Sequence, residues 1–487
     1  MKLKITRRGP SPRPAFPPGS DTGGPARIIQ YGLLALIVLS PLPVASVNEW
    51  SILVIELAVL AMTGIYVLAN DKPAINPRLE KKLKWPRYAF MALFAFIVFQ
   101  TVPLPAFLVR FLSPGTFAFH KAFSPGFTGA GLLSLSIVPA RTFGEGLELA
   151  AYVLAGFLVV RTVTRGREVR RIIAFLVAVG AFEAFYGLYE LTTANPRLLF
   201  YKKVYSLGSV TGTFVNRSHL AGYLEIIIPL AIGLLIARLD FLSLGGAGLK
   251  AKLLHMTNKG LVPNLLLFAA VIVMSLGVVF SQSRAGIFTL ALTFILFVEF
   301  IVLHFGRFGP RRRWLRNFIW VTLLLITVSA LYIGVGSTIQ RFALDDLLRE
   351  GRPLLWGNVG RIISVFPVFG TGLGTFVSVY PAYEKFAGPE LLLVHAHNDY
   401  LEYISELGGI GFVLLFGAVL YIAVSSFLTW RGRRNPDVKG IALGGIISVL
   451  VILFHSLTDF NLHIPANMLL FAIVLALTFV TAFYRKT

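Results

Sequence analysis

The chain of 487 residues is 56% hydrophobic and only 14% charged, with a mean hydropathy of +0.75. Because soluble domains carry about 25% charged residues, this composition excludes a soluble domain and indicates a protein that crosses a membrane many times. The sequence contains no cysteine, which excludes disulfides and thiolate chemistry.

The chain begins with a segment, residues 1–27, that is basic and rich in Pro, Gly and Ser, which predicts a disordered cytoplasmic tail. A cleaved signal peptide ending near Val44-Ala45-Ser46 is the alternative, but the long Pro-rich lead and the full-length apolar run after it favour a retained first helix. A membrane span needs about 20 apolar residues, and about twelve runs meet that criterion. They are approximately 28–47, 51–70, 88–108, 146–163, 171–192, 219–237, 263–281, 285–303, 317–336, 408–429, 440–457 and 464–484.

The formal net charge of +22 suggests an acidic partner until its distribution along the chain is considered. If the N-terminus is cytoplasmic, the basic residues concentrate in the inner loops. They are Lys72, Arg78, Lys81, Lys82, Lys84, Arg87, Arg161, Arg165, Arg167, Arg170, Arg171, Lys250, Lys252, Lys259, Arg307, Arg311, Arg312, Arg313, Arg316, Arg431, Arg433, Arg434 and Lys439. This is the positive-inside pattern. The basic excess therefore indicates topology, and we expect no nucleic-acid partner.

The predicted fold is an all-α integral membrane protein with nine transmembrane helices in residues 28–336, a large outer loop at 337–407 and three helices in 408–487. The loop is far longer than the roughly 12–15 residues beyond which connections are usually functional or disordered. It contains Trp356, a helical stretch at 354–366 and a glycine-rich turn, so we expect a partly helical element on the outer surface.

The stretch HAHNDYLEYISELGGIGF, residues 395–412, ends this loop. Its pattern predicts a helix with Asn398 or Asp399 as N-cap, which places His397 just before a helix N-terminus, where anions are favoured. The spacing His395, His397 and Asp399 also fits an H-x-H-x-D metal site, although a zinc site would need further ligands. A purely structural role for His397 is the third alternative.

Three arginines lie at or near the outer ends of predicted spans. Arg284 stands between two apolar runs, where a cation is costly and should face the protein interior or an outer cavity. Arg352 and Arg217 lie in the outer loops. If they converged with His397, their guanidinium groups would suit a pyrophosphate, because guanidinium binds phosphate oxygens bidentately. Snorkelling at a helix end is the structural alternative for Arg284.

These segments together resemble the bacterial O-antigen ligase and polymerase superfamily, membrane glycosyltransferases of the C-type class. The family signature is His, a small polar residue, nine residues, Gly, two residues and a small residue, and it matches from His397-Asn398 through Gly408 to Gly411. TGTFVNRSHLAGYL, FPVFGTGLGTF and HSLTDFNLHIPANMLLF resemble other family segments, so the resemblance covers most of residues 130–480.

The resemblance implies a role for each matching position. His397 matches the essential histidine and would act as general base; Arg284 and Arg352 match family arginines, with Phe288 where the R-x-x-x-L motif has Leu. Ser218 stands where the family more often has Asn, so the pyrophosphate role expected for Arg217 rests on the convergence of the arginines and not on the resemblance. Asn398, Glu402, Glu406 and His219 would support the site, and helix-surface positions are the equal alternative for the two glutamates.

The implied reaction moves a glycan from undecaprenyl diphosphate to lipid A–core or a growing polysaccharide at the periplasmic face of the bacterial inner membrane. The family inverts the anomeric centre and uses no metal or other cofactor. Ligases and polymerases share the signature, so the motifs alone leave both open. The alternative from another class is a secondary transporter or a lipid-linked oligosaccharide flippase, because Glu56, Glu183, Glu190 and Glu225 lie within apolar runs.

Overall fold

The computed structural model describes residues 24–238, 261–304, 352–384 and 393–484, apart from positions 71, 74, 125, 126, 194, 195 and 434, together with isolated positions between 320 and 328. Residues 1–23 of the predicted tail, most of the ninth predicted span, and residues 337–351 and 385–392 of the predicted loop lie outside the described residues. The last four residues of the predicted tail, 24–27, instead form the first turn of a helix. Within them the chain is mostly helical, with two short antiparallel strand pairings, β1 (Leu104–Pro105) with β2 (Leu132–Leu133) and β3 (Arg197–Leu198) with β4 (Tyr201–Lys202).

Eight helices of the described part are long and apolar enough to cross a membrane. They are α2 (Glu49–Leu68), α6 (Pro139–Thr162), α7 (Gly166–Glu190), α8 (Arg217–Arg238), α10 (Leu261–Phe280), α17 (Asp399–Arg431), α18 (Pro436–His455) and α19 (Pro465–Phe483). Three further helices coincide with predicted spans: α1 (Gly24–Leu39), α3 (Pro77–Thr101) and α11 (Arg284–His304). The multi-pass helical architecture is confirmed, while the number of twelve spans stays a prediction.

Several predicted spans have different bounds in the structure. The third, predicted at 88–108, is α3 from Pro77 to Thr101, because the Asn76 cap begins the helix earlier and Pro103 follows its end. The fourth begins at Pro139 instead of residue 146. The first ends at Leu39 instead of residue 47, because Pro41 and Pro43 interrupt the helix and the chain turns through the 3-10 segment Val44–Ser46. The tenth begins at Asp399, nine residues before the predicted start at 408, with Asn398 as N-cap. Gly408 adopts φ 61° inside α17, so the helix consists of a short part before Gly408 and a long part after it.

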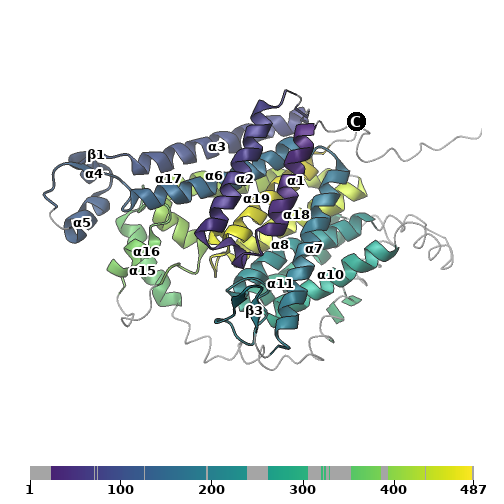
Figure 1. Cartoon of the computed structure of the whole chain (residues 1–487). Helices are drawn as coiled ribbons and strands as arrows, with labels where there is room; N and C mark the ends of the chain where they lie inside the picture. The colour runs from purple at the N-terminus through teal and green to yellow at the C-terminus, as the bar shows by residue number, and fades with distance from the viewer. Residues whose placement is uncertain are drawn as a thin grey trace, which may run out of the picture.

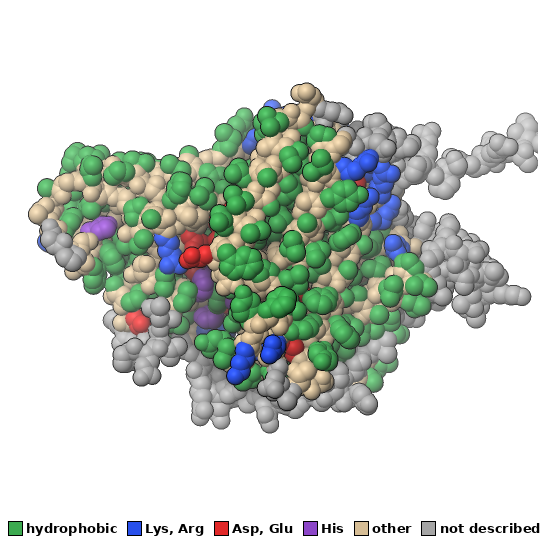
Figure 2. All heavy atoms as spheres, viewed as in Figure 1, with side chains coloured by type: hydrophobic (Ala, Val, Ile, Leu, Met, Phe, Trp, Pro, Cys, Tyr) green, Lys and Arg blue, Asp and Glu red, His purple; other side chains and the backbone are tan. Residues whose placement is uncertain are grey.

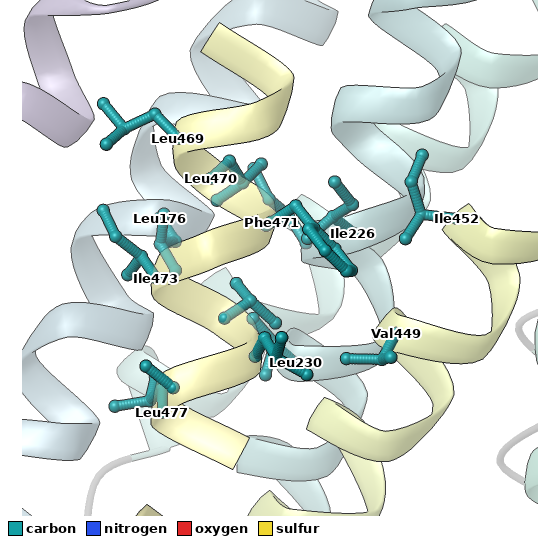
Figure 3. Packing of buried hydrophobic residues seen from close by; sticks show 14 of the residues in the cluster. Leu176, Ile226, Leu230, Val449, Ile452, Leu469, Leu470, Phe471, Ile473 and Leu477 are labelled. Atoms are coloured by element: carbon teal, nitrogen blue, oxygen red, sulfur yellow. The ribbon is translucent and has the colours of Figure 1, made fainter. Parts of the chain in front are cut away.

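The core of the bundle forms around α8, whose spanning window is completely buried. Figure 3 shows how Ile226 and Leu230 of α8 lie among Leu176 of α7, Val449 and Ile452 of α18 and side chains of α19. Glycines allow the closest approach between α8 and α18: a Cβ atom on Gly444 would lie only 2.5 Å from the carbonyl oxygen of Pro229.

A second, smaller hydrophobic cluster lies at one end of the bundle and includes Leu355, Phe366 and Phe376. It contains α15 (Arg352–Val365), which confirms the helix predicted at 354–366, and α16 (Phe376–Val379) with the 3-10 turn Tyr380–Ala382. The short helices α4 (Ala106–Leu112) and α5 (Pro114–Phe123) lie at the far end of α3, on the same side (Figure 1).

The two ends of the bundle differ in charge. The spans α8 and α17 begin at Arg217 and Asp399 and end at Arg238 and Arg431, while α18 runs in the opposite direction to His455. On the face shown in Figure 2, Asp and Glu side chains left of the centre lie beside His and also Lys and Arg side chains, another His side chain lies further left, and the largest group of Lys and Arg side chains lies at the upper right. We call these the histidine end and the basic end.

Replacing Gly444 with Val should destabilise the protein, because the added atoms meet backbone of α8. Overpacking of this kind typically costs about 1–3 kcal/mol, so we expect a lower midpoint of thermal unfolding in detergent. Gly417→Val on α17 is the control, because a Cβ atom there meets no atom within 4 Å. Equal midpoints for Gly444→Val and the unchanged protein would contradict this packing.

Candidate active site

His397 lies in the extended segment immediately before α17. Its backbone has φ 48°, a left-handed conformation that is uncommon for a residue other than glycine. The side chain of Asn398 accepts a hydrogen bond from Leu401 N and its amide group donates to Leu457 O, so it both caps α17 and ties it to the turn after α18. The imidazole of His397 is 32% exposed. It is therefore held by local geometry and remains accessible.

The partner of His397 is a buried carboxylate. Nδ1 of His397 lies 3.3 Å from Oδ1 of Asp459, whose side chain is 3% exposed. The same oxygen lies 3.8 Å from Nε2 of His219 and accepts a hydrogen bond from Phe460 N. Burial alone would raise the pKa of Asp459, but its hydrogen bond with His397 and the nearby imidazoles hold that pKa below its ordinary value. Asp459 is thus a fixed anion that orients His397.

Phe460 separates the histidines from one another. Its ring stacks on His395 with centroids 4.1 Å apart and meets His397 and His219 edge-on at 4.9 and 4.5 Å. Because three imidazoles pack against this one ring, Phe460 fixes their relative positions without offering a polar group of its own.

His397, Asp459, Arg217 and Arg352 line one cavity of about 750 Å³. The other lining residues are Tyr205, Ser206, Val215, Asn216, Ser218, Leu355 and Leu393. Arg217 is the first residue of α8 and Arg352 the first of α15, so two helix N-termini also approach the cavity. Arg352 donates to Thr458 O at 2.7 Å and Arg217 contacts Ser209 Oγ at 3.4 Å. These features favour an anionic ligand.

Arg284 is the first residue of α11, after a turn in which Gln282 has φ 57°. It is half-buried, and it is not among the described residues that line the cavity. The structure therefore brings two of the three predicted arginines together with His397.

The residues of the H-x-H-x-D stretch have three separate partners. His395 pairs with Glu402 at 2.7 Å, His397 with Asp459, and Asp399 with Nδ1 of His463 at 2.7 Å. Glu402 also accepts a hydrogen bond from Ala396 N at 2.8 Å. In the part of the chain that the structure describes, no group of three or more His, Asp or Glu side chains is arranged to hold a metal ion. Glu402 thus holds the backbone on which His397 sits and does not contact its ring in the described hydrogen bonds.

Glu406 holds the glycine-rich turn, residues 369–376, against the part of α17 that precedes Gly408. Its carboxylate accepts hydrogen bonds from Gly374 N and Phe376 N at 2.8 and 2.9 Å. Gly370 and Gly408 face each other so closely that a Cβ atom on either would meet the other's backbone nitrogen. The glycines of FGTGLGTF therefore serve close backbone packing at the break in α17.

The sequence analysis assigned no role to Asp459, Phe460 or His463, although it quoted the segment that contains them. One feature of the sequence could have indicated them: Asp459 stands between His455 and His463, at the end of an apolar run. Their contact with a loop some sixty residues earlier depends on how α17 and α18 pack, as the 62-residue separation of the His397–Asp459 pair illustrates.

Replacing His463 with Gln should destabilise the protein at neutral pH. Burial would lower the pKa of His463, but Glu402 and Asp399 outweigh it and raise that pKa to about 10. The folded-state pKa lies above the unfolded value, so the stabilisation is complete below about pH 6.5 and is lost as the pH rises through 10. The difference in thermal midpoint between the two proteins should therefore shrink towards pH 10, whereas a constant difference would contradict this assignment. His120→Gln on α5 is the control.

Comparison with known families identifies one region of the chain. Residues 269–416 match a protein-family model described as O-Antigen ligase, a region that includes Arg284, Arg352, His397 and Glu406. No curated protein matches the chain. The family match agrees with the motifs around His397 and Gly408, and it supports a similarity of this region to the O-antigen ligase and polymerase superfamily.

Proposed function

We propose that this protein is a membrane glycosyltransferase that moves a glycan from undecaprenyl diphosphate to an acceptor hydroxyl. The observation that carries the proposal is the shared cavity, which combines a carboxylate-held imidazole with two guanidinium groups. The acceptor is the lipid A–core or a growing polysaccharide. The reaction takes place on the periplasmic side of the inner membrane, because the histidine end lies opposite the basic ends of the spans and basic residues favour the cytoplasmic side.

The proposed chemistry begins with the proton of the acceptor hydroxyl. A hydrogen bond from Nδ1–H of His397 to Asp459 leaves Nε2 as the ring atom that can accept a proton. As Nε2 takes this proton, the hydroxyl oxygen bonds to the anomeric carbon from the face opposite the leaving group. The bond from that carbon to the diphosphate oxygen breaks, and its electron pair stays on the lipid diphosphate. The configuration is therefore inverted, and the imidazolium is stabilised by Asp459.

The two arginines act on the leaving group. Negative charge grows on the diphosphate oxygen as the bond to the sugar breaks, and fixed cations at that position lower the barrier. Arg217 and Arg352 are prepositioned by helix starts and by their contacts with Ser209 and Thr458. A role for Arg284 rests on its motif position alone. No step in this scheme requires a metal ion, since the proton acceptor and the anion-stabilising groups are side chains.

The transporter and flippase alternative rested on carboxylates in apolar runs. Glu183 accepts hydrogen bonds from Thr213 N and Oγ1, Glu225 pairs with His455 at 2.9 Å, and Glu190 lies 3.6 Å from Lys203 Nζ. Each of these three therefore ties helices or loops together within the fold. Glu56 lies half-buried on α2. These contacts favour structural roles and leave glycan transfer as the better supported function.

His397→Ala should abolish transfer, because general-base catalysis contributes about 10²–10⁴-fold. Asp459→Asn should also reduce turnover strongly, since the amide keeps the shape but not the charge that stabilises the imidazolium. The assay supplies the purified protein with a glycan on a polyprenyl diphosphate and an acceptor glycan, and detects the glycosidic product. His120→Ala, outside the cavity, should be unaffected. Full activity of His397→Ala would refute the catalytic assignment.

Arg352→Ala should raise the KM for the lipid-linked donor more than Arg352→Lys does. Lysine keeps the charge but loses the bidentate geometry, so an intermediate effect is expected for it. Arg361→Ala, at an exposed position further along α15, is the matched control and should behave as the unchanged protein. If Arg352→Ala left donor kinetics unchanged, the proposed diphosphate contact would be wrong.

A further inference from the structure

An apolar groove of about 290 Å³ lies between α3, α6, α17 and α19, away from the cavity that contains His397. Its floor is formed by α19 and α6, with Phe471, Leu475 and Phe479 among the lining side chains, and α3 forms one wall through Phe90 and Phe94. The wall residues include none of those that line the His397 cavity.

The groove lies between the two packed ends of α3. At the start of the helix, Asn76 donates a hydrogen bond to Phe483 O at 2.8 Å and Leu79 is buried in the core. Towards the histidine end, a Cβ atom on Gly146 would lie 2.9 Å from Ile97, and one on Gly411 would lie 3.0 Å from Phe96. Towards the basic end, the floor contains the small residues Gly156, Ala472 and Ala476, which leave space beneath α3.

The length of the groove matches one leaflet of a bilayer. Along α3 it extends from Leu83 to Phe94, which is about 16 Å at the helical rise of 1.5 Å per residue. Half of a hydrocarbon core that is about 30 Å thick is about 15 Å. The groove therefore covers the depth of an acyl chain in the leaflet on the basic side.

Cations from α3 and α6 lie at the end of the groove nearest the basic end. Arg87 of α3 lines the groove and lies 2.7 Å from Glu80, which also pairs with Arg161 of α6 at 3.0 Å. Nζ of Lys82 lies 5.9 Å from the ring centre of Tyr421 on α17. Arg87 and Arg161 thus share one carboxylate, and Lys82 adds a further positive charge on the same stretch of α3, so the excess positive charge lies where a phospholipid headgroup would be.

We propose that this groove is a binding site for an anionic phospholipid of the leaflet on the basic side. One acyl chain fills the apolar groove, and the headgroup phosphate lies beside Arg87 and Lys82. Such a lipid would join α3 to α19, two helices that touch each other little. The proposal does not depend on the glycosyltransferase function, because it rests on a separate part of the chain.

The test compares two lipids that differ only in headgroup charge. The purified full chain is titrated with phosphatidylglycerol or with phosphatidylcholine of the same acyl chains, and bound lipid is counted by native mass spectrometry while thermal unfolding is followed. We expect one phosphatidylglycerol to be retained preferentially and to raise the midpoint of unfolding. Equal retention of both lipids, or of neither, would overturn the proposal.

Two substitutions probe the two parts of the site. Arg87→Gln should weaken phosphatidylglycerol binding by about fivefold, since a cation near a lipid surface contributes about that much. Ala472→Phe fills the groove and should abolish retention of the lipid. Leu420→Phe, at an exposed position of α17 outside the groove, is the control and should retain it. If Ala472→Phe does not fold, the Arg87→Gln variant tests the proposal alone. Unchanged binding of phosphatidylglycerol to Arg87→Gln would overturn the headgroup contact.

Discussion

The buried carboxylate of Asp459 is the interaction on which the site depends. A buried charge is costly unless it is paired and hydrogen-bonded, and Asp459 meets this requirement through His397, His219 and the amide of Phe460. The pairing joins the turn after α18 to the segment before α17 and the start of α8. The left-handed backbone of His397 is kept in place by this arrangement, together with the Glu402 contacts just before it. One anion therefore organises three helix ends around one cavity.

The second constraint is close backbone packing. Small residues bring α8 and α18 together in the centre of the bundle, and Gly370 and Gly408 bring the glycine-rich turn against the break in α17. These contacts determine where Arg352 and His397 lie, because α15 precedes the turn and the histidine segment precedes α17. The rigid core thus positions loops that carry the chemistry, which is the usual division of roles between scaffold and site.

Local patterns in the sequence were sufficient for the parts of the fold that local forces decide. Apolar runs located eleven helices of the described part, the Asn398 cap followed from its side chain, and the helix at 354–366 followed from its composition. The bounds of the first and third spans were misplaced, since Pro41 acts on the helix before it and the Asn76 cap begins α3 earlier. The helix that begins after Asn398 was predicted correctly, and it continues past Gly408 into the tenth predicted span. Asp459 was missed for a different reason. Its importance comes from contacts across 62 residues, which spacing along the chain cannot reveal. The positions of Arg217 and Arg352 beside His397 likewise depend on the packing of α8 and α15.

The central claim is that the cavity with His397 opens to the outer side and holds a lipid diphosphate. The natural sequence lacks cysteine, so Ser206→Cys at the cavity lining gives a single reactive thiol. Labelling of intact cells with a membrane-impermeant maleimide should modify this thiol, and added polyprenyl diphosphate should slow the labelling of the purified protein. A thiol that is labelled only after the membrane is opened, or whose labelling is indifferent to the diphosphate, would contradict the account.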